Sequence, residues 1–262
     1  MSGNLDPRRG RYLLLLSLLA VALLIIPACG HDNNTGTTVV EQAPVITVLA
    51  AGSPVADSVA YPEINYYAAA VVPGAFYKIS ITDMNDDADL LVFGADGTFT
   101  FLSQCSIDNT AFFDAAPEDC VIMAPGNTLY FAVDGLYLLG SVGFFTIAVD
   151  PVATTNLTLY LPRSDALGRW EARIYAVPVP VTDDYTISIT GLSDDADLYV
   201  FGTDAFLTAP VSCPIDNTHL AGAVPEDCTL PSGAGVLYFV VDGLFSSTAA
   251  VSYTALAAPA IP

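Results

Sequence analysis

The chain has 262 residues, of which 53% are hydrophobic and only 13% are charged, and its formal net charge is −21. This composition supplies enough apolar side chains for one large domain or for two of ordinary size. A surface this acidic repels nucleic-acid phosphates and anionic lipid head groups, which argues against nucleic-acid binding. It is typical of an acidic, soluble, secreted surface, and it leaves calcium or a cationic surface open as a partner.

The first segment has the pattern of an export signal. Three arginines precede an uninterrupted apolar run of 15 residues, Tyr12 to Ile26. That is the length of a signal-peptide core, and it is shorter than the ~20 residues that a membrane-spanning helix requires. The run ends at "IPACG", which resembles the lipobox of bacterial lipoproteins, where the Cys becomes the lipidated first residue. Pro27 departs from that pattern, since a small or aliphatic residue is more usual there.

These features predict an export route and an anchor. We expect residues 1–28 to form a signal helix that is removed, and Cys29 to carry lipid; cleavage near Ala28 as an ordinary secretory signal is the alternative. Residues 29–45 then comprise the lipidated Cys and a flexible tether, because Asn, Thr and Gly dominate this stretch. The predicted location is the outer membrane or the cell surface, with a membrane contact through the lipid; a periplasmic or secreted protein is the alternative.

The rest of the chain is duplicated. Residues 77–135 align without a gap with residues 185–243 at an offset of 108, and 31 of these 59 positions are identical. The shared segments include "ISIT", "DDADL", "VFG", "IDNT", "PEDC" and "VDG". A repeat of this length predicts two domains of similar structure, at residues 46–150 and 151–262.

The cysteines follow the duplication. With Cys29 assigned to lipid, the remaining four form two pairs of equal spacing, Cys105 with Cys120 and Cys213 with Cys228. Such pairs form disulfides in an oxidising compartment. A metal site is the rival interpretation, but no Cys-x-x-Cys pair supports it.

Each repeat reads as a series of short strands. "FYKISIT" and "DYTISIT" alternate apolar and polar side chains, and "TLYFAVDG" and "VLYFVVDG" carry aromatic and β-branched residues into an Asp-Gly turn. We expect an all-β fold built of antiparallel sandwiches.

"YTISITGLSDDADLYVFG", followed by "LYFVVDG" and a final Tyr-containing strand, resembles the bacterial pre-peptidase C-terminal (PPC) domain. The resemblance covers both repeats and implies two tandem jelly-roll-like β-sandwiches. Such domains accompany secreted peptidases or surface proteins, and some related members bind collagen or calcium. The chain departs from the family in having no peptidase domain and in its Cys-bounded "CxIDNTxxxxxxPEDC" insert.

Clustered acids in each repeat have two interpretations. One is structural: acids that satisfy backbone amides where a strand begins. The other is calcium, which prefers several oxygen ligands, although no EF-hand loop is present. The candidate calcium ligands are Asp86, Asp87, Asp89, Asp108, Glu118 and Asp119 in the first repeat, and Asp194, Asp195, Asp197, Asp216, Glu226 and Asp227 in the second. The calcium interpretation is favoured if the "PEDC" segment folds back beside "DDADL".

Catalysis has little support. The two histidines are His31, in the tether, and His219, which is matched by Ala111 in the other repeat. A nucleophile with a histidine base is therefore not indicated. We expect a non-catalytic surface lipoprotein with two binding or adhesion modules and an unknown protein or polysaccharide partner. The alternatives are an accessory or chaperone-like module for a secreted enzyme, and a carbohydrate-binding or carbohydrate-degrading protein.

Overall fold

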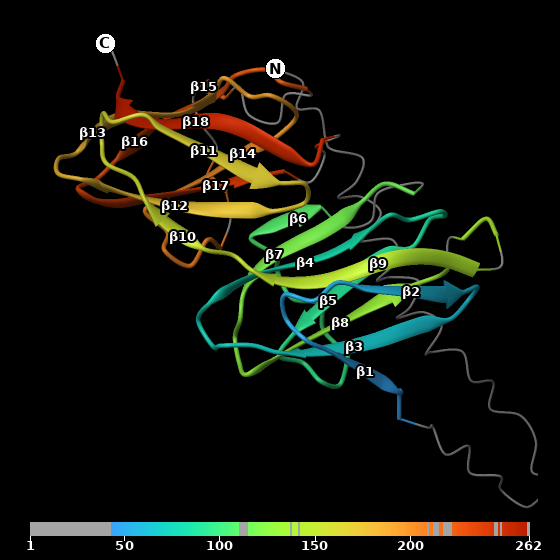
Figure 1. Ribbon diagram of the computed structural model, residues 1–262. Helices are drawn as coiled ribbons and strands as arrows, with labels where there is room; N and C mark the ends of the chain where they lie inside the picture. The colour runs from blue at the N-terminus through green and yellow to red at the C-terminus, as the bar shows by residue number, and fades with distance from the viewer. Residues whose placement is uncertain are drawn as a thin grey trace, which may run out of the picture. The chain divides into compact units, whose positions relative to one another are not determined.

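The computed structural model describes residues 43–109, 115–136, 138–140, 142–208, 210–211, 215–216, 222–243, 246 and 248–260. Residues Pro44–Pro262 form one compact unit. The described residues are all-β, as predicted, and contain no helix (Figure 1). Accordingly, this part of the chain has no helix long and apolar enough to span a membrane. The predicted signal helix, Cys29 and most of the tether lie outside the described residues.

The first repeat builds two sheets. In one, four strands have the order β1 (Ile46–Leu49), β3 (Ile64–Ala70), β8 (Thr128–Asp134), β5 (Asp89–Gly94). In the other, five strands have the order β2 (Val55–Ala60), β9 (Val142–Pro151), β4 (Phe76–Thr82), β7 (Glu118–Met123), β6 (Ile107–Asn109). Figure 1 shows these strands in blue to yellow-green.

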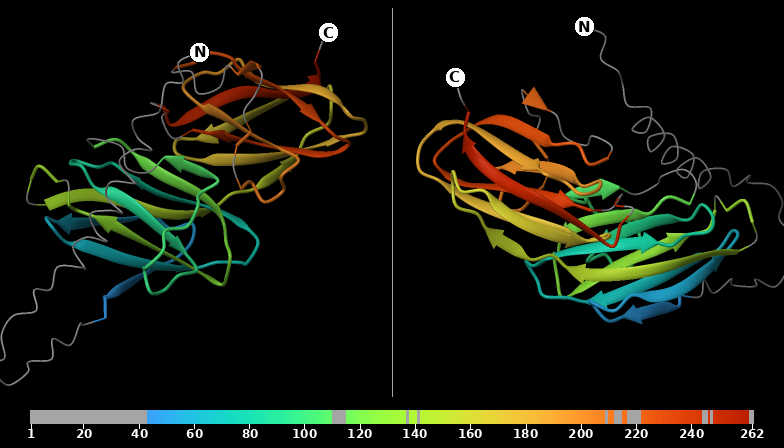
Figure 2. Two further views of the ribbon diagram at one scale, coloured as in Figure 1. Left: turned by 180° about the vertical axis from the view of Figure 1, so that it is seen from behind. Right: turned by 45° about the horizontal axis from the view of Figure 1, so that its top comes forward.

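The second repeat builds two sheets with the same pattern. One has the order β10 (Thr154–Asn156), β12 (Ala172–Val179), β17 (Gly235–Asp242), β14 (Asp197–Gly202). The other has the order β11 (Arg163–Gly168), β18 (Ala250–Pro259), β13 (Asp183–Thr190), β16 (Glu226–Ser232), β15 (Ile215–Asp216). These strands run from yellow to red in the views of Figure 2.

The cores follow the sequence alternation. In the first repeat, Ile79 and Ile81 of β4 meet Phe131 and Val133 of β8 in one buried cluster, to which both sheets contribute. The second repeat has an equivalent cluster that includes Ile187, Ile189 and Phe239. Alternate residues of a strand point to opposite faces, so each "ISIT" strand presents its isoleucines to the facing sheet. The fold is therefore β-sandwich-like in each repeat.

The predicted antiparallel pairing is wrong at two sheet edges. β1 pairs with β3 in parallel, and β10 pairs with β12 in parallel. In each repeat the strand between them in sequence, β2 or β11, belongs to the other sheet. The chain therefore crosses to the opposite sheet and returns in its original direction, which makes the two neighbours parallel. The other strand pairs among the described residues are antiparallel, as predicted.

One predicted disulfide is confirmed. Cys105 and Cys120 are bonded, with their Cα atoms 5.4 Å apart. Cys120 is fully buried in the first core, so the bond ties the loop before β6 to the centre of the sandwich. In the chain-entropy model, a disulfide that closes a loop of about 15 residues stabilises a fold by about 3 kcal/mol. Cys228 is also disulfide-bonded, but its predicted partner, Cys213, lies outside the described residues.

A third buried cluster joins side chains of both repeats within the compact unit. Ile107 and Val121, from β6 and β7, belong to the same cluster as Tyr199 and Phe201 of β14. In β14 the outward face is consequently buried, whereas Leu91, the equivalent of Tyr199, is only half-buried in β5. The acid at the start of β14 therefore lies in a drier environment than its counterpart in β5.

Candidate functional site: the repeated carboxylates

The "PEDC" segment does fold back beside "DDADL" in both repeats. A carboxylate oxygen of Glu118, on β7, accepts a hydrogen bond from the backbone N–H of Leu90 at 2.7 Å. Its counterpart Glu226, on β16, accepts one from Leu198 at the same distance. Both glutamates are fully buried. Each carboxylate thus fastens the start of one sheet's edge strand to the other sheet, which is a structural task.

Asp86 and Asp194 hold neighbouring loops. The Asp86 carboxylate accepts hydrogen bonds from the backbone N–H groups of Leu139 and Gly140, at 3.0 and 2.6 Å. These bonds lower the pKa of Asp86, the Gly140 bond most strongly. Asp194 accepts equivalent bonds from the Thr248 N–H at 2.6 Å and the Ser246 hydroxyl at 3.1 Å. In both repeats this acid closes the loop between the last two strands.

Asp89 and Asp197 lie opposite a second acid. Asp89 faces Asp134 across β5 and β8, and Asp197 faces Asp242 across β14 and β17. Burial, together with repulsion from Asp87 and Asp134, raises the pKa of Asp89 to about 7. For Asp197, burial and then repulsion from neighbouring acids, Glu226 first among them, raise the pKa to about 8. Proton uptake at these two positions is therefore favoured in the folded state.

The chain's only lysine lies beside this acidic group in the second repeat. Lys78, on β4 of the first repeat, is 2% exposed and donates to Asp242 at 2.5 Å. It also forms an ion pair with Asp119 of β7. Burial alone would lower the pKa of Lys78, but the two carboxylates raise it above its ordinary value. The ammonium group is therefore charged at neutral pH and links the two repeats through a buried ion pair.

Lys78 was not predicted as a site residue, although its position in the repeat is unusual. It interrupts the otherwise repeated strand "YKISIT", where the second repeat has Thr186. A lysine on a strand with apolar neighbours is ordinarily a solvated residue on the outer face. Here the outer face is covered, because Val121, its cross-strand neighbour, belongs to the cluster shared by both repeats.

Among the described residues, the predicted calcium ligands do not form a single group. Asp108 is exposed on β6, Asp227 is half-buried on β16, and the side chain of Asp216 lies outside the described residues. Asp195 accepts a hydrogen bond from the Gly222 N–H at 2.9 Å. Within the described part of the chain, no three His, Cys, Asp or Glu side chains are grouped as metal ligands.

The "PEDC" segment lies beside "DDADL", which favours calcium, but its glutamate binds a backbone amide in each repeat, so we expect calcium to leave stability unchanged. Glu118 and Asp86 already bind backbone amides, so coordination would cost existing hydrogen bonds. The melting temperature should agree within about 1 °C in millimolar calcium and in excess chelator, because only a ligand that binds the native state raises it. A calcium-dependent rise of several degrees would instead assign a site to the acids around Asp89.

Removing the Glu118 carboxylate should destabilise the fold. Glu118→Ala leaves the buried Leu90 N–H without its acceptor, which costs about 1–3 kcal/mol in urea-induced unfolding. Glu118→Gln keeps a side-chain oxygen and serves as the matched control, with a smaller loss. Equal losses in the two variants would show that charge, and not the hydrogen bond to Leu90, is what Glu118 contributes.

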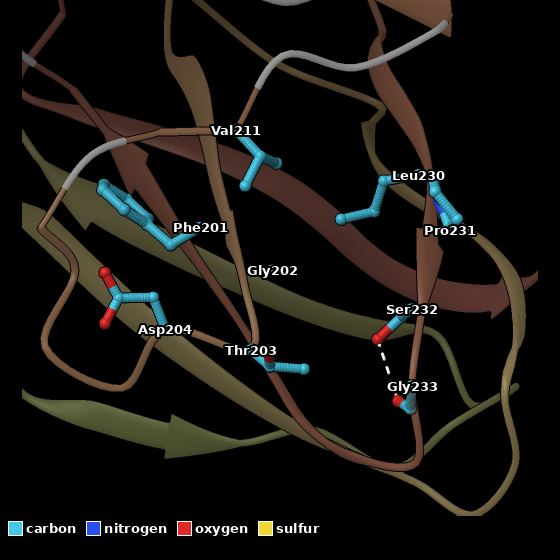
Figure 3. Close-up of a pocket in the computed structure, with 9 residues that line it drawn as sticks. All are labelled: Phe201, Gly202, Thr203, Asp204, Val211, Leu230, Pro231, Ser232 and Gly233. Atoms are coloured by element: carbon cyan, nitrogen blue, oxygen red, sulfur yellow. Dashed lines mark hydrogen bonds between the residues drawn. The ribbon is translucent and has the colours of Figure 1, made fainter.

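A depression at the end of β14 is lined by apolar side chains, two hydroxyl side chains and one acid. Phe201, Val211 and Leu230 line one part of it, and the turn after β16 closes another (Figure 3). Its one acid, Asp204, accepts backbone hydrogen bonds from Phe206 at 2.9 Å and from Thr208 at 2.7 Å. The Thr208 contacts lower the pKa of Asp204, so it stays ionised and acts as the anchor of its own turn.

A second depression lies on the first repeat, between β2 and β9. Asp57, Ser58, Asp83, Phe144 and Thr146 are among the residues that line it. This depression was not predicted from the sequence, because Asp57 and Asp83 lie outside the identical segments "DDADL" and "PEDC".

No protein-family model matches the chain, and no curated protein matches it.

Proposed function

We propose that this protein is an exported, lipid-anchored cell-envelope protein that binds a partner and does not catalyse a reaction. Residues 46–150 and 151–262 would be two tandem PPC-like sandwiches, carried on a tether that begins at lipidated Cys29. In this view the sandwiches are binding or adhesion modules.

The proposal rests on one observation: Glu118 and Glu226 have the same structural role in the two repeats. Each glutamate accepts a hydrogen bond from the backbone N–H of the second residue of an edge strand, at 2.7 Å in each case. This residue is Leu90 in β5 and Leu198 in β14. An acid duplicated together with its backbone contact serves the fold and is not available as a general acid or base. What the duplication leaves free to differ between the repeats is exposed surface, which is where a binding module carries its specificity.

The proposed location rests on separate features. The Arg-rich start, the apolar run and "IPACG" are those of an exported lipoprotein. The Cys105–Cys120 disulfide supports export, because such bonds persist in oxidising compartments.

Two measurements test the proposal. Wild-type protein expressed in a bacterial host should incorporate a labelled fatty acid, and Cys29→Ser should not. Chemical cross-linking of intact cells should then recover a defined envelope protein with the anchored form. Capture of a secreted enzyme would favour the accessory role instead, and binding or turnover on a glycan array would favour the carbohydrate role.

A further inference from the structure

The depression between β2 and β9, which we call the Asp57 depression, presents two carboxylates without an internal cation. Asp57 accepts hydrogen bonds from its neighbour Ser58 N–H and from the Tyr67 hydroxyl, both at 2.8 Å. Asp83 is exposed at the same depression. Among the described residues, no Lys or Arg forms an ion pair with either acid.

The second repeat shows what binds at the equivalent position. Asp165, the counterpart of Asp57, also contacts a tyrosine hydroxyl, that of Tyr175, at 3.1 Å. In addition it binds two guanidinium groups: Arg173 pairs with one carboxylate oxygen, and Arg163 donates to the other at 3.1 Å. Burial alone would raise the pKa of Asp165, but these hydrogen bonds, that of Arg173 above all, lower it to about 2.

The first repeat has neither arginine at the equivalent positions. Val55 and Asn65 occupy the positions of Arg163 and Arg173, and Asp83 replaces Gly191. The same acid that is neutralised within the chain in one repeat is therefore accompanied by a second acid in the other. At the position of Arg173, Asn65 donates instead to the Ser58 carbonyl at 2.7 Å, so among the described residues no guanidinium group pairs with Asp57. The carboxylate of Asp57 therefore keeps the chemistry of a guanidinium site.

Exposed apolar side chains adjoin the Asp57 depression. Phe144 lines it and is 59% exposed. Strand register places Val142 opposite Ala60, and the Gly135 N–H donates to the Glu63 carbonyl at 3.0 Å, so the turn after β2 lies beside the loop after β8. We define the apolar face as the exposed hydrophobic residues of this region: Tyr61, Ile64, Leu136, Leu139, Val142 and Phe144.

Three residues of the apolar face are replaced by polar residues in the second repeat, whereas Leu136 is matched by Leu244. Leu139 is 96% exposed and Tyr61 is 56% exposed. In the sequence of the second repeat, Tyr61, Leu139 and Phe144 correspond to Arg169, Ser247 and Ser252. An exposed apolar cluster with a polar rim is typical of a protein interaction site, and a pure fold requirement would have kept it in both repeats.

We propose that the Asp57 depression binds an arginine side chain of a basic partner protein, whose neighbouring apolar residues pack on the apolar face. This inference rests on the proposed binding function and specifies its partner. Acidic Glu63, Asp83 and Asp86 surround the face, so the complementary surface carries an apolar centre and a basic rim.

The charge of the chain favours a different protein over lipid or a second copy. Residues 29–262 contain four basic and 27 acidic residues, so anionic membranes and other copies are repelled. The arginines of the described part are also engaged: two bind Asp165, and Arg169 donates to the Ser246 carbonyl and lies 4.1 Å from the Trp170 ring centre.

Selection from a phage-displayed library of random seven-residue peptides on the full-chain protein tests the proposal. We expect enriched peptides to carry arginine next to Leu, Phe or another large apolar residue. Their affinity should fall at least about tenfold in Asp57→Asn/Asp83→Asn, since charge-assisted contacts are lost while the Tyr67 contact keeps an acceptor. It should fall several-fold in Phe144→Ser, which installs the second-repeat residue.

Asn65→Arg gives the sharpest variant, because it restores the arginine of the second repeat. It should block peptide binding and leave the melting temperature close to that of the wild type, because a new ion pair with Asp57 offsets the lost hydrogen bond from Asn65 to the Ser58 carbonyl. A retained melting temperature distinguishes occupation of the depression from misfolding. Asp183→Asn, an exposed acid of the second repeat, is the matched charge control and should bind normally. Enriched peptides without basic residues, or affinity unchanged in the Asp57 and Asn65 variants, would overturn this inference while leaving a binding function intact.

Discussion

Replacing Lys78 with methionine is expected to lower the free energy of unfolding by about 3–5 kcal/mol. Met has nearly the same length but no charge, so Asp119 and Asp242 would remain buried without the ammonium group. Removing one partner of a buried ion pair is costly because the remaining charge keeps its desolvation penalty. Urea-induced unfolding at pH 7 measures the loss.

Thr186→Met is the matched control for Lys78→Met. It changes the equivalent position of the second repeat, where Thr186 and Thr229 share a hydroxyl hydrogen bond at 2.8 Å, and should cost only about 1 kcal/mol. Adding Asp119→Asn and Asp242→Asn to Lys78→Met should recover at least half of the loss, since these two positions then carry no buried charge. A loss below about 1 kcal/mol in Lys78→Met itself would contradict the buried ion pair.

Stability should fall as pH rises from 5 to 8. The carboxyl group of Asp197 loses its proton near its ordinary pKa when the chain is unfolded, but near 8 when it is folded. Between these values the folded state binds more protons than the unfolded state, so the free energy of unfolding decreases with pH. For a raised pKa of this size, the change over these three pH units is on the order of 4 kcal/mol.

Asp197→Asn separates this effect from general charge repulsion. The variant should show a shallower slope of melting temperature between pH 5 and 8, and Asp89→Asn/Asp197→Asn should flatten it further, because the pKa of Asp89 is raised to about 7. Asp183→Asn removes an exposed acid and should leave the slope as it is in the wild type. Wild-type stability that increases from pH 5 to 8 would contradict the proposed protonation of these acids.

Much of the sandwich could be predicted because its determinants are local. The alternation in "FYKISIT" and "DYTISIT" sets which residues enter the core, and Ile79, Ile81, Ile187 and Ile189 are all fully buried. The spacing of Cys105 and Cys120 likewise identified a disulfide that the fold contains. The parallel edge pairs could not be predicted, because they depend on β2 and β11 crossing to the opposite sheet.

The residues of the candidate site could be predicted from the sequence, but the partners that they bind could not. "DDADL" and "PEDC" lie together as expected, yet whether Glu118 binds a cation or the Leu90 amide depends on distances that no spacing rule contains. Lys78 and Asp57 were missed for a related reason. Each has its role because of residues distant in sequence. Lys78 pairs with Asp242, and Asp57 lines the same depression as Phe144.

Site-specific photo-cross-linking in intact cells tests the central claim, that the two repeats share fold-supporting acids and differ in one binding face. A photoreactive amino acid would replace Phe144 in the first repeat or Ser252, its exposed equivalent, in the second. We expect a discrete cross-link to one basic envelope protein from position 144, lost on adding Asn65→Arg, and none from position 252. Equal cross-linking from both positions, or cross-linking from position 252 alone, would contradict the claim.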